Sequence, residues 1–373
     1  MEIVSAVIGA FLLYQLLDYL YYRFWSRNLF VDISFTREYA VEGEEMSLVE
    51  AITNKKILPL PVLQVKFMTT KYFNFLDTEN STVTDHFYRN DIVSVMMYQK
   101  LTKTLTFMCS HRGFYTINRM DVIGINLFLK NEIVKTFPLD IHLYVYPRPI
   151  NMSDFQIAFQ KMFGTVLTKR YINEDPFEFR NIREYQTYDN LKLINWKASA
   201  KTDSLKVNVH EYTSSQQVSI FLNMEPECIW RYEELEEESI RIASSFALEF
   251  INQGIPVSLH TNARDIITKE PSVIEAGSGA NHIRTIQETL ARIDLSLDPP
   301  AFVPSVQEEF LRASVNDFII IISTYQKESL QQLLLSQLHA RTEFVWIVPK
   351  NQDIKLTISD ELSEVVIPWE HQE

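Results

Sequence analysis

The N-terminal segment is the strongest constraint on how this chain can fold. Residues Ile3–Leu17 carry no charge, and after Asp18 the apolar character continues as far as Tyr22. A helix over Ile3–Tyr22 would be about 30 Å long, which matches the hydrocarbon layer of a bilayer. We therefore predict a transmembrane anchor within residues 1–28.

The residues beside this segment predict its orientation. Its C-terminal end holds aromatic residues of the kind that gather at a membrane interface, namely Tyr19, Tyr21, Tyr22 and Trp25. Arg23 and Arg27 lie at this same end, whereas Glu2 is the only charged side chain before the segment. By the positive-inside rule, we expect a single-pass protein of the cell membrane whose globular part is cytoplasmic.

The segment allows two other interpretations. A cleavable signal peptide needs a basic start and a small-residue cleavage site, and the sequence has neither. A buried or amphipathic helix stays open as an alternative, because Gln15 and Asp18 are costly in lipid.

The bulk composition excludes several classes of protein. A chain of 373 residues exceeds the usual size of one domain, so we expect two folded domains. The net charge of −13 would repel a phosphate backbone, and we therefore expect no nucleic-acid partner. The two cysteines, Cys109 and Cys228, lie far apart and form neither a disulfide framework nor a zinc motif.

Residues 29–150 have the pattern of an antiparallel β-sandwich domain. Apolar and polar residues alternate there over short stretches, and turn residues recur about every ten positions, as in all-β sandwiches. The loop Asn54–Pro61 contains prolines, which are excluded from central strands. The expected strands are LFVDISFTREYAV, SLVEAI, PVLQVKFM, Ile92–Gln99, KTLTFMCS, GFYTINRMDVI and IHLYVYP.

Residues 217–373 alternate between strands and helices, which predicts an α/β domain with a parallel, doubly wound sheet. Val218–Leu222 and Asp317–Thr324 are continuous apolar runs suited to strands buried on both faces. Glu233–Gln253 places its apolar residues on one helical face and stops before Gly254. Further strands are expected at PVSLHT, Phe344–Pro349 and Val365–Pro368, with helices at Asn281–Ile293 and Lys327–Ala340.

Residues 151–216 are expected to hold a helix, SDFQIAFQKMF, and then a dense polar segment. That segment, Asp175–Tyr212, resembles the signature of the domain of unknown function 58 (DUF 58) family, FR-x-x-REY-x-x-x-D-x-x-x-x-INWK-x-SA-[RK]-x-x-x-L. His111–Tyr115 and Val145–Pro149 resemble shorter family motifs. This sequence departs from the pattern at Tyr188, where glycine is usual, and at Lys192, where arginine is commoner.

The resemblance implies a C-terminal domain similar to that of von Willebrand factor A. It also implies a partner, because members of the family commonly accompany MoxR-type AAA+ ATPases. The family has no established activity, so the resemblance implies no reaction.

The signature supports both a functional and a structural interpretation. Its basic side chains could pair with carboxylates or phosphates of a partner. Alternatively, its charges could satisfy the backbone of an irregular segment while Trp196 anchors the core, and we favour this for Asn195 and Trp196. The candidate interaction residues are Arg180, Arg183, Glu184, Tyr185, Asp189, Lys192, Asn195, Trp196 and Lys197.

A second candidate site follows the strand at Val218–Leu222. Von Willebrand A domains that bind Mg²⁺ carry Asp-x-Ser-x-Ser there, whereas this chain has Asn223, Glu225 and Glu227. We expect the standard metal site to be lost, with Asn223, Glu225 and Glu227 as a degenerate form of the motif that no longer binds Mg²⁺ in the usual way. Two carboxylates could still hold a divalent cation, so a metal-dependent adhesion module remains the alternative.

Sequence motifs for catalysis are largely missing. The chain contains no phosphate-binding loop, no dinucleotide-binding glycine motif and no nucleophile elbow. A hydrolase with Glu184 or Asp189 as base has no nucleophile to support it. We therefore expect a non-enzymatic interaction protein without a cofactor, which binds the membrane and a MoxR-type AAA+ ATPase.

Overall fold

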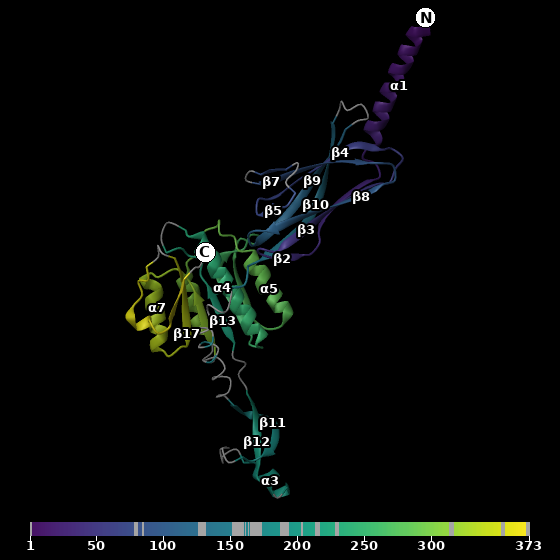
Figure 1. Ribbon diagram of the computed structural model, residues 1–373. Helices are drawn as coiled ribbons and strands as arrows, with labels where there is room; N and C mark the ends of the chain where they lie inside the picture. Colours follow the sequence, from purple (N-terminus) through teal and green to yellow (C-terminus); the bar gives the residue numbers. More distant parts are fainter. Residues whose placement is uncertain are drawn as a thin grey trace. The chain divides into compact units, whose positions relative to one another are not determined.

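The computed structural model describes most of the chain in two compact units, Met1–Arg148 and Pro149–Glu373 (Figure 1). The sequence predicts the end of the first domain at residue 150. The structure describes residues 2–77, 81–83, 86–125, 132–150, 160, 162, 164, 174–186, 194–202, 204–212, 217–227, 231–312, 317–351 and 355–370.

The first unit begins with α1 (Glu2–Phe24), which is long and apolar enough to cross a membrane. Its side chains between Ile3 and Leu17 are mostly exposed, as a lipid-facing helix requires. Tyr21 and Trp25, however, are buried in the core of the unit. The expectation that these two rings lie at a membrane interface is therefore wrong.

The burial of Trp25 depends on a close approach to the sheet. Gly124 lies under the indole ring, and a Cβ atom at this position would collide with the ring of Trp25. Tyr21 is 1% exposed and Trp25 3% exposed. The C-terminal end of α1 is therefore packed into the strands that follow it.

The remainder of the first unit consists of two sheets. The four-stranded sheet has the order β1-β3-β8-β5, and the six-stranded sheet has the order β2-β10-β9-β4-β7-β6. All their pairings are antiparallel except the short pairing of β2 with β10. The strands are β1 (Leu29–Phe35), β2 (Tyr39–Val41), β3 (Glu45–Asn54), β4 (Leu60–Thr70), β5 (Phe73–Phe75), β6 (Ser81–Val83), β7 (His86–Val95), β8 (Lys100–Cys109), β9 (Gly113–Ile125) and β10 (Glu132–Tyr146).

One apolar core joins the two sheets and confirms the predicted sandwich. In β3, buried residues alternate with half-buried ones, and Leu48 and Ile52 point into the same core as Val65 of β4. Phe73 and Phe107 pack with ring centroids 4.5 Å apart. Each such side chain contributes about 1.5–3 kcal/mol when fully buried.

The predicted strand Ile92–Gln99 is too long at its C-terminal end. β7 ends at Val95, and residues 96–99 turn the chain into β8. The side chain of Gln99 closes this turn, because its Oε1 accepts a hydrogen bond from the Met96 amide at 2.7 Å. Tyr98 has a φ of 50°, which a strand does not allow.

A cluster of charged residues contains buried side chains from both sheets of the sandwich, whereas two of its members, Asp77 and Lys103, are partly exposed. Arg89 donates to Asp91 at 2.7 Å and to Asp77 at 2.9 Å, and Lys103 donates to Asp91 at 2.7 Å. Glu50, opposite Lys103 in the β3–β8 register, is 1% exposed. Among the described residues, neither of its carboxyl oxygens has a hydrogen-bond partner. Burial, followed by the negative charge of Asp91, raises the pKa of Glu50 to about 7.

The raised pKa of Glu50 predicts a pH-dependent stability. The folded state holds this proton more tightly than the unfolded state, so its contribution is fully present below about pH 4.5 and is lost as pH rises through about 7. Between pH 5 and pH 8, we expect the wild type to lose about 2 kcal/mol of unfolding free energy relative to Glu50→Gln. Denaturant unfolding of both proteins across this range measures the difference.

The matched control is Glu45→Gln, at an exposed position of the same strand. This substitution should leave the pH dependence of the wild type unchanged. A Glu50→Gln variant that keeps the wild-type slope would show that Glu50 is not the titrating group.

The second unit is built on a six-stranded sheet with the order β15-β14-β13-β16-β17-β18. β14, β13, β16, β17 and β18 are parallel, and only the edge strand β15 runs antiparallel. This confirms the predicted parallel α/β architecture. The strands are β13 (Val218–Leu222), β14 (Val257–Arg264), β15 (Pro271–Gly277), β16 (Phe318–Ile322), β17 (Phe344–Lys350) and β18 (Val366–Glu370).

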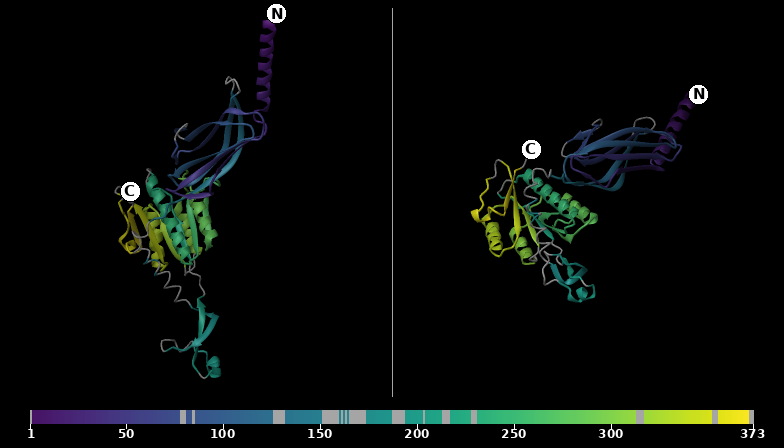
Figure 2. Two further views of the ribbon diagram at one scale, coloured as in Figure 1. Left: turned by 45° about the vertical axis from the view of Figure 1, so that its right-hand side comes forward. Right: turned by 60° about the horizontal axis from the view of Figure 1, so that its bottom comes forward.

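Helices flank this sheet (Figure 2). Ile220 belongs to a core with Phe246 of α4 and Leu290 of α5, whereas the next residue, Phe221, packs with Val306 of α6 and Leu330 of α7. Since successive strand residues point to opposite faces, the helices cover both sides. Their bounds are α4 (Glu233–Asn252), α5 (Ala280–Ala291), α6 (Phe302–Arg312) and α7 (Glu328–His339), and a short 3-10 turn, η2 (Asp360–Leu362), precedes β18.

The end of α4 follows its sequence signal. Gly254 adopts a φ of 75°, and the amides of Gly254 and Ile255 donate to the carbonyls of Ile251 and Phe250. The segment between the two domains is described only in part. The predicted helix SDFQIAFQKMF lies largely outside the described residues.

Candidate functional site

The described part of the polar segment Asp175–Tyr212 lies on two paired strands and a short helix. β11 (Glu174–Glu184) pairs antiparallel with β12 (Lys206–Tyr212), and α3 (Trp196–Thr202) lies next to β12 (Figure 1). The Tyr185 amide donates to the carbonyl of Leu205 at 2.9 Å, which extends the pairing beyond β11.

Asn195 has a structural role in this segment. Its Oδ1 accepts from the Ala198 amide at 2.9 Å, which caps the first turn of α3. The Asn195 amide donates to the Lys206 carbonyl, and the Lys206 amide donates to Ser199 Oγ, both at 2.8 Å. Asn195 therefore attaches α3 to β12.

Trp196 is not a core residue, contrary to the sequence expectation. It is the first residue of α3, and its side chain is 68% exposed. Lys197 and Arg183 are also exposed, and Arg183 Nη1 donates to the carbonyl of Glu184 at 3.0 Å. Ile194 and Val207, on either side of α3 in sequence, are the buried apolar residues of the described part of this segment, and the side chain of Trp196 is not among them.

The other signature residues are placed incompletely. Glu184 is exposed and pairs with Lys206 at 3.1 Å, and Tyr185 is half-buried. Arg180 lies within β11, but its side chain is not described. Asp189 and Lys192 lie outside the described residues. The structure therefore places Arg183, Glu184 and Tyr185 at the end of β11 and Asn195, Trp196 and Lys197 at the start of α3, and leaves Arg180, Asp189 and Lys192 untested.

The second candidate site lies at the carboxyl edge of the parallel sheet. Asn223, directly after β13, is 2% exposed. Its Nδ2 donates to Ser323 Oγ at 2.8 Å, and Ser323 directly follows β16. Its Oδ1 accepts from Asn262 Nδ2 of β14 at 2.9 Å. Three neighbouring strand ends are thus joined through one amide, at the point where the strand order reverses and ligands usually bind.

The partners of Asn223 are themselves fully used. Asn262 donates to the Pro300 carbonyl at 3.0 Å, and its Oδ1 accepts from the Met224 amide at 2.8 Å. Ser323 Oγ accepts from the Tyr325 amide at 3.0 Å. Because buried polar groups must find partners, this network fixes the loops at the strand ends.

The two glutamates of the loop hold neighbouring segments. Glu225 Oε2 accepts from the Phe302 amide at 2.9 Å, at the first residue of α6. Glu227 Oε2 accepts from the Gln326 amide at 2.5 Å, shortly before α7 begins. Carboxylates are stabilised near helix N-termini, where backbone amides lack intrahelical partners.

This arrangement does not fit an octahedral cation. Such a site needs several oxygens that converge on one point. At Asn223, an amide nitrogen faces Ser323, and the single amide oxygen also accepts from the Glu225 amide at 2.8 Å. Glu225 and Glu227 are committed to two different helices. The residues at positions 223, 225 and 227 therefore act as structural acceptors.

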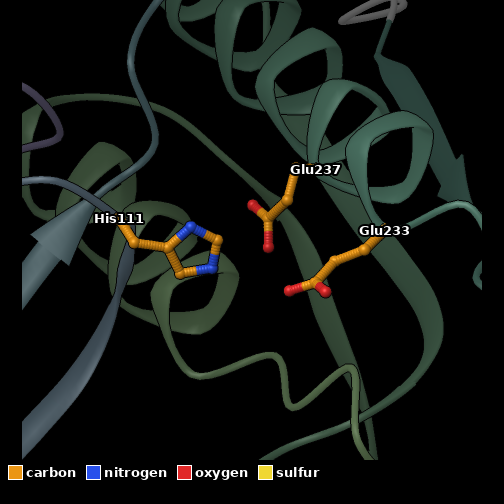
Figure 3. A group of neighbouring side chains, drawn as sticks. All are labelled: His111, Glu233 and Glu237. Atoms are coloured by element: carbon orange, nitrogen blue, oxygen red, sulfur yellow. The ribbon is translucent and has the colours of Figure 1, made fainter. Parts of the chain in front are cut away.

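The glutamates in the first turns of α4 differ in their surroundings. Glu236 is buried and pairs with Arg231 at 3.0 Å, and burial raises its pKa even though Arg231 opposes this. Glu238 accepts from the indole of Trp369 at 2.8 Å. Glu233 and Glu237 lie one turn apart, and carboxyl oxygens of the two approach within 4.8 Å of each other (Figure 3).

His111, which Figure 3 also draws, belongs to the first unit. Its ring stacks on that of Tyr72 with centroids 4.7 Å apart. In the motif His111–Tyr115, Tyr115 is the more connected residue, since its hydroxyl donates to the carbonyls of His111 and Arg112, both at 3.0 Å. The motif therefore closes the turn before β9.

Comparisons with known proteins give no family assignment. No family model and no curated protein matches the sequence. Among solved structures, the CARDB domain of a Pyrococcus furiosus protein, solved with di-metal ions, is 18% identical over 30% of this chain and 86% of that one, with a TM-score of 0.20. Domains D2 and D3 of the pilin SpaD from Corynebacterium diphtheriae are 12% identical over 31% of this chain and 52% of that one, with a TM-score of 0.23.

A third similar structure is the sporulation control protein Spo0M from Bacillus subtilis. It is 10% identical, over 43% of this chain and 58% of that one, with a TM-score of 0.21. Similarities at this level carry no functional argument. The resemblance to the DUF 58 family therefore stays a prediction.

The network at the strand ends makes a stability prediction. Asn223→Ala would leave Ser323, Asn262 and the Glu225 amide without a shared partner in a buried site. We expect a loss of about 2–3 kcal/mol in unfolding free energy, the usual cost of stranding buried polar groups. Denaturant unfolding followed by tryptophan fluorescence measures it.

Asn281→Ala is the matched control, because Asn281 lies at the exposed start of α5. This change should alter stability by no more than about 0.5 kcal/mol. Equal losses in the two variants would contradict a special role for the Asn223 amide.

Proposed function

We propose that this protein is a membrane-anchored, non-enzymatic interaction protein. Its sandwich and α/β units both face the cytoplasm. It works with a MoxR-type AAA+ ATPase in the assembly or maturation of membrane or envelope complexes. The ATPase partnership rests on the resemblance to the DUF 58 family.

The anchor is supported by α1, whose apolar residues are exposed as far as Leu17. The cytoplasmic orientation is supported by the position of Arg23 and Arg27 at the C-terminal end of the helix. A von Willebrand A-like assignment of the second unit is supported by its parallel sheet with one antiparallel edge strand and helices on both faces.

The observation that carries the proposal is the hydrogen-bond network around Asn223. In doubly wound sheets this edge commonly binds small ligands through loop side chains. Here one side-chain oxygen each of Asn223, Glu225 and Glu227 accepts a hydrogen bond from a backbone amide. These bonds hold the loops in one arrangement. A surface that is already ordered loses less conformational entropy when a protein binds to it, which favours docking of a protein there.

The exposed face of the signature supplies candidate contacts for the partner. Trp196, Lys197 and Arg183 are all exposed. Tryptophan and arginine are the residue types most enriched among interface hot spots. Their exposure on a small hairpin, rather than in a core, is consistent with a role in recognition.

A crosslinking experiment tests the partnership. After crosslinking in native membranes, purification of the wild-type protein should recover an AAA+ ATPase of the MoxR type. Trp196→Ala should reduce that recovery about tenfold or more, which corresponds to the loss of one hot-spot residue. Quantitative mass spectrometry of the crosslinked material gives the readout.

The control is Leu311→Ala, which removes another exposed apolar side chain, on α6. It should leave ATPase recovery unchanged. If no ATPase of this class is recovered with the wild type, the partnership is wrong. If Trp196→Ala and Leu311→Ala behave alike, the signature is not its contact surface.

Divalent metals test the alternative of a metal-dependent adhesion module. A cation that binds only the folded state raises its stability, by about 2.7 kcal/mol at a hundredfold excess over the dissociation constant. Because Glu225 and Glu227 are already committed as acceptors, we expect no change in melting temperature with millimolar Mg²⁺ or Mn²⁺. A metal-dependent rise that Glu225→Gln abolishes would restore the adhesion module.

A further inference from the structure

The end of the sandwich where α1 joins it has an unusual charge. Three segments form this end, residues 19–31, 54–60 and 96–100. Together they contain only basic charges, although the chain as a whole carries −13. These are Arg23, Arg27, Lys55, Lys56 and Lys100.

Backbone pairing places the three segments side by side. β1 begins with Leu29 opposite Asn54, the last residue of β3, and Lys100 at the start of β8 lies opposite Thr53. The Lys55 amide donates to the carbonyl of Asn28 at 2.9 Å. The loop between β3 and β4 therefore lies against the chain just after α1.

A buried asparagine fixes this loop to the turn between β7 and β8. Asn54 is 0% exposed, and its Nδ2 donates to the carbonyls of Leu58 at 3.0 Å and Met96 at 2.9 Å. The Tyr98 amide also donates to the carbonyl of Lys56 at 3.2 Å. The loop and the turn thus form one surface, which we call the basal surface, residues 55–58 and 96–99.

The basal surface exposes large apolar side chains. Ile57 is 70% exposed, Tyr98 68% and Met97 55%. Tyr98 has a φ of 50°, a conformation that favours glycine or asparagine over an aromatic residue. An aromatic residue kept at such a position points to a use for its side chain.

We propose that the basal surface enters the headgroup region of an anionic membrane beside α1. The sandwich would then hold the membrane at a second place besides the helix. The partner is a lipid surface with negatively charged headgroups. This inference rests on the proposed membrane anchoring of α1.

Continuity with α1 favours lipid over other occupants. Tyr21 and Trp25 are buried in the sandwich core, so the end of the helix and the basal surface belong to one packed body. The loop between β3 and β4 forms a backbone hydrogen bond with Asn28, and Asn28 lies four residues after Phe24, the last residue of α1. A surface this close to the helix end lies at headgroup depth when α1 spans the bilayer.

The residue types suit this depth. Tyrosine, lysine and arginine are typical of membrane interfaces, and a basic cluster attracts anionic headgroups. Lys55 and Lys100 are exposed and supply the accessible charge, whereas the amino nitrogen of Lys56 is buried. Exposed apolar side chains surrounded by basic residues are typical of protein surfaces that bind at the membrane interface.

The test places a fluorophore at chosen positions of the full-length protein in vesicles. Single-cysteine variants Ile57→Cys and Tyr98→Cys carry an environment-sensitive label. The control is Glu45→Cys, at the other, exposed end of β3. All are made in a Cys228→Ser background, and Cys109 stays unlabelled because it is fully buried and burial raises its pKa to about 12.

The vesicles contain phosphatidylcholine and phosphatidylglycerol, with spin-labelled lipid as quencher. We expect labels at positions 57 and 98 to shift their emission to shorter wavelength and to lose most of their fluorescence. The label at position 45 should do neither. Lys55→Glu with Lys100→Glu, at two exposed positions, should weaken the quenching in anionic vesicles and have little effect in vesicles of phosphatidylcholine alone.

Two outcomes separate this inference from the proposed anchoring. If the protein fails to float with the vesicles, α1 is not an anchor and both ideas are overturned. If it floats and the labels at 57 and 98 stay unquenched, only the membrane contact of the basal surface is overturned. The exposed side chains of Ile57 and Tyr98 would then be assigned to an interface with another protein.

Discussion

Two buried asparagines, one in each unit, impose the arrangement on which the candidate surfaces depend. A buried amide group is costly unless it forms hydrogen bonds within the protein, and forming them requires the loops around it to adopt one shape. Asn54 joins the β3–β4 loop to the β7–β8 turn by donating to Leu58 and Met96. Asn223 joins the ends of β13, β14 and β16 through Asn262 and Ser323. In both places a polar side chain at the end of a strand orders loops that apolar packing alone would leave free.

The fold was largely predictable wherever burial acts on both faces of an element. Val218–Leu222 and Phe318–Ile322 are runs of apolar residues because helices cover both sides of the sheet. The sequence predictions did not include β15 or α6. β15 is an edge strand with no fully buried residue, so its composition carries little periodic signal. The predicted strand at Ile92–Gln99 ran too far for a related reason, since Met96 and Met97 are apolar yet exposed in a turn.

The candidate site was less predictable because its partners lie far away in sequence. Asn223, Glu225 and Glu227 could be identified from their position after a buried strand. Their partners Asn262 and Ser323 lie 39 and 100 residues away, and only the strand order brings them together. One feature of the sequence could have indicated these partners. Ser323, directly after β16, and Asn262, within β14, are polar residues next to apolar stretches. The exposure of Trp196 could not be inferred from the sequence. The many charged and aromatic residues of this segment do not show which of its side chains are buried.

The packing of α1 changes what an N-terminal anchor can do. If the helix were joined by a flexible linker, only its charges would set the orientation of the protein, and the sandwich could tumble. Tyr21 and Trp25 instead lie in the sandwich core, and Gly124 allows the indole ring to approach the sheet. Rotation or tilt of the helix must therefore move the sandwich with it. An exposed patch beside the helix end is then held at a fixed distance from the helix, which is the geometry that the proposed membrane contact of Ile57 and Tyr98 requires.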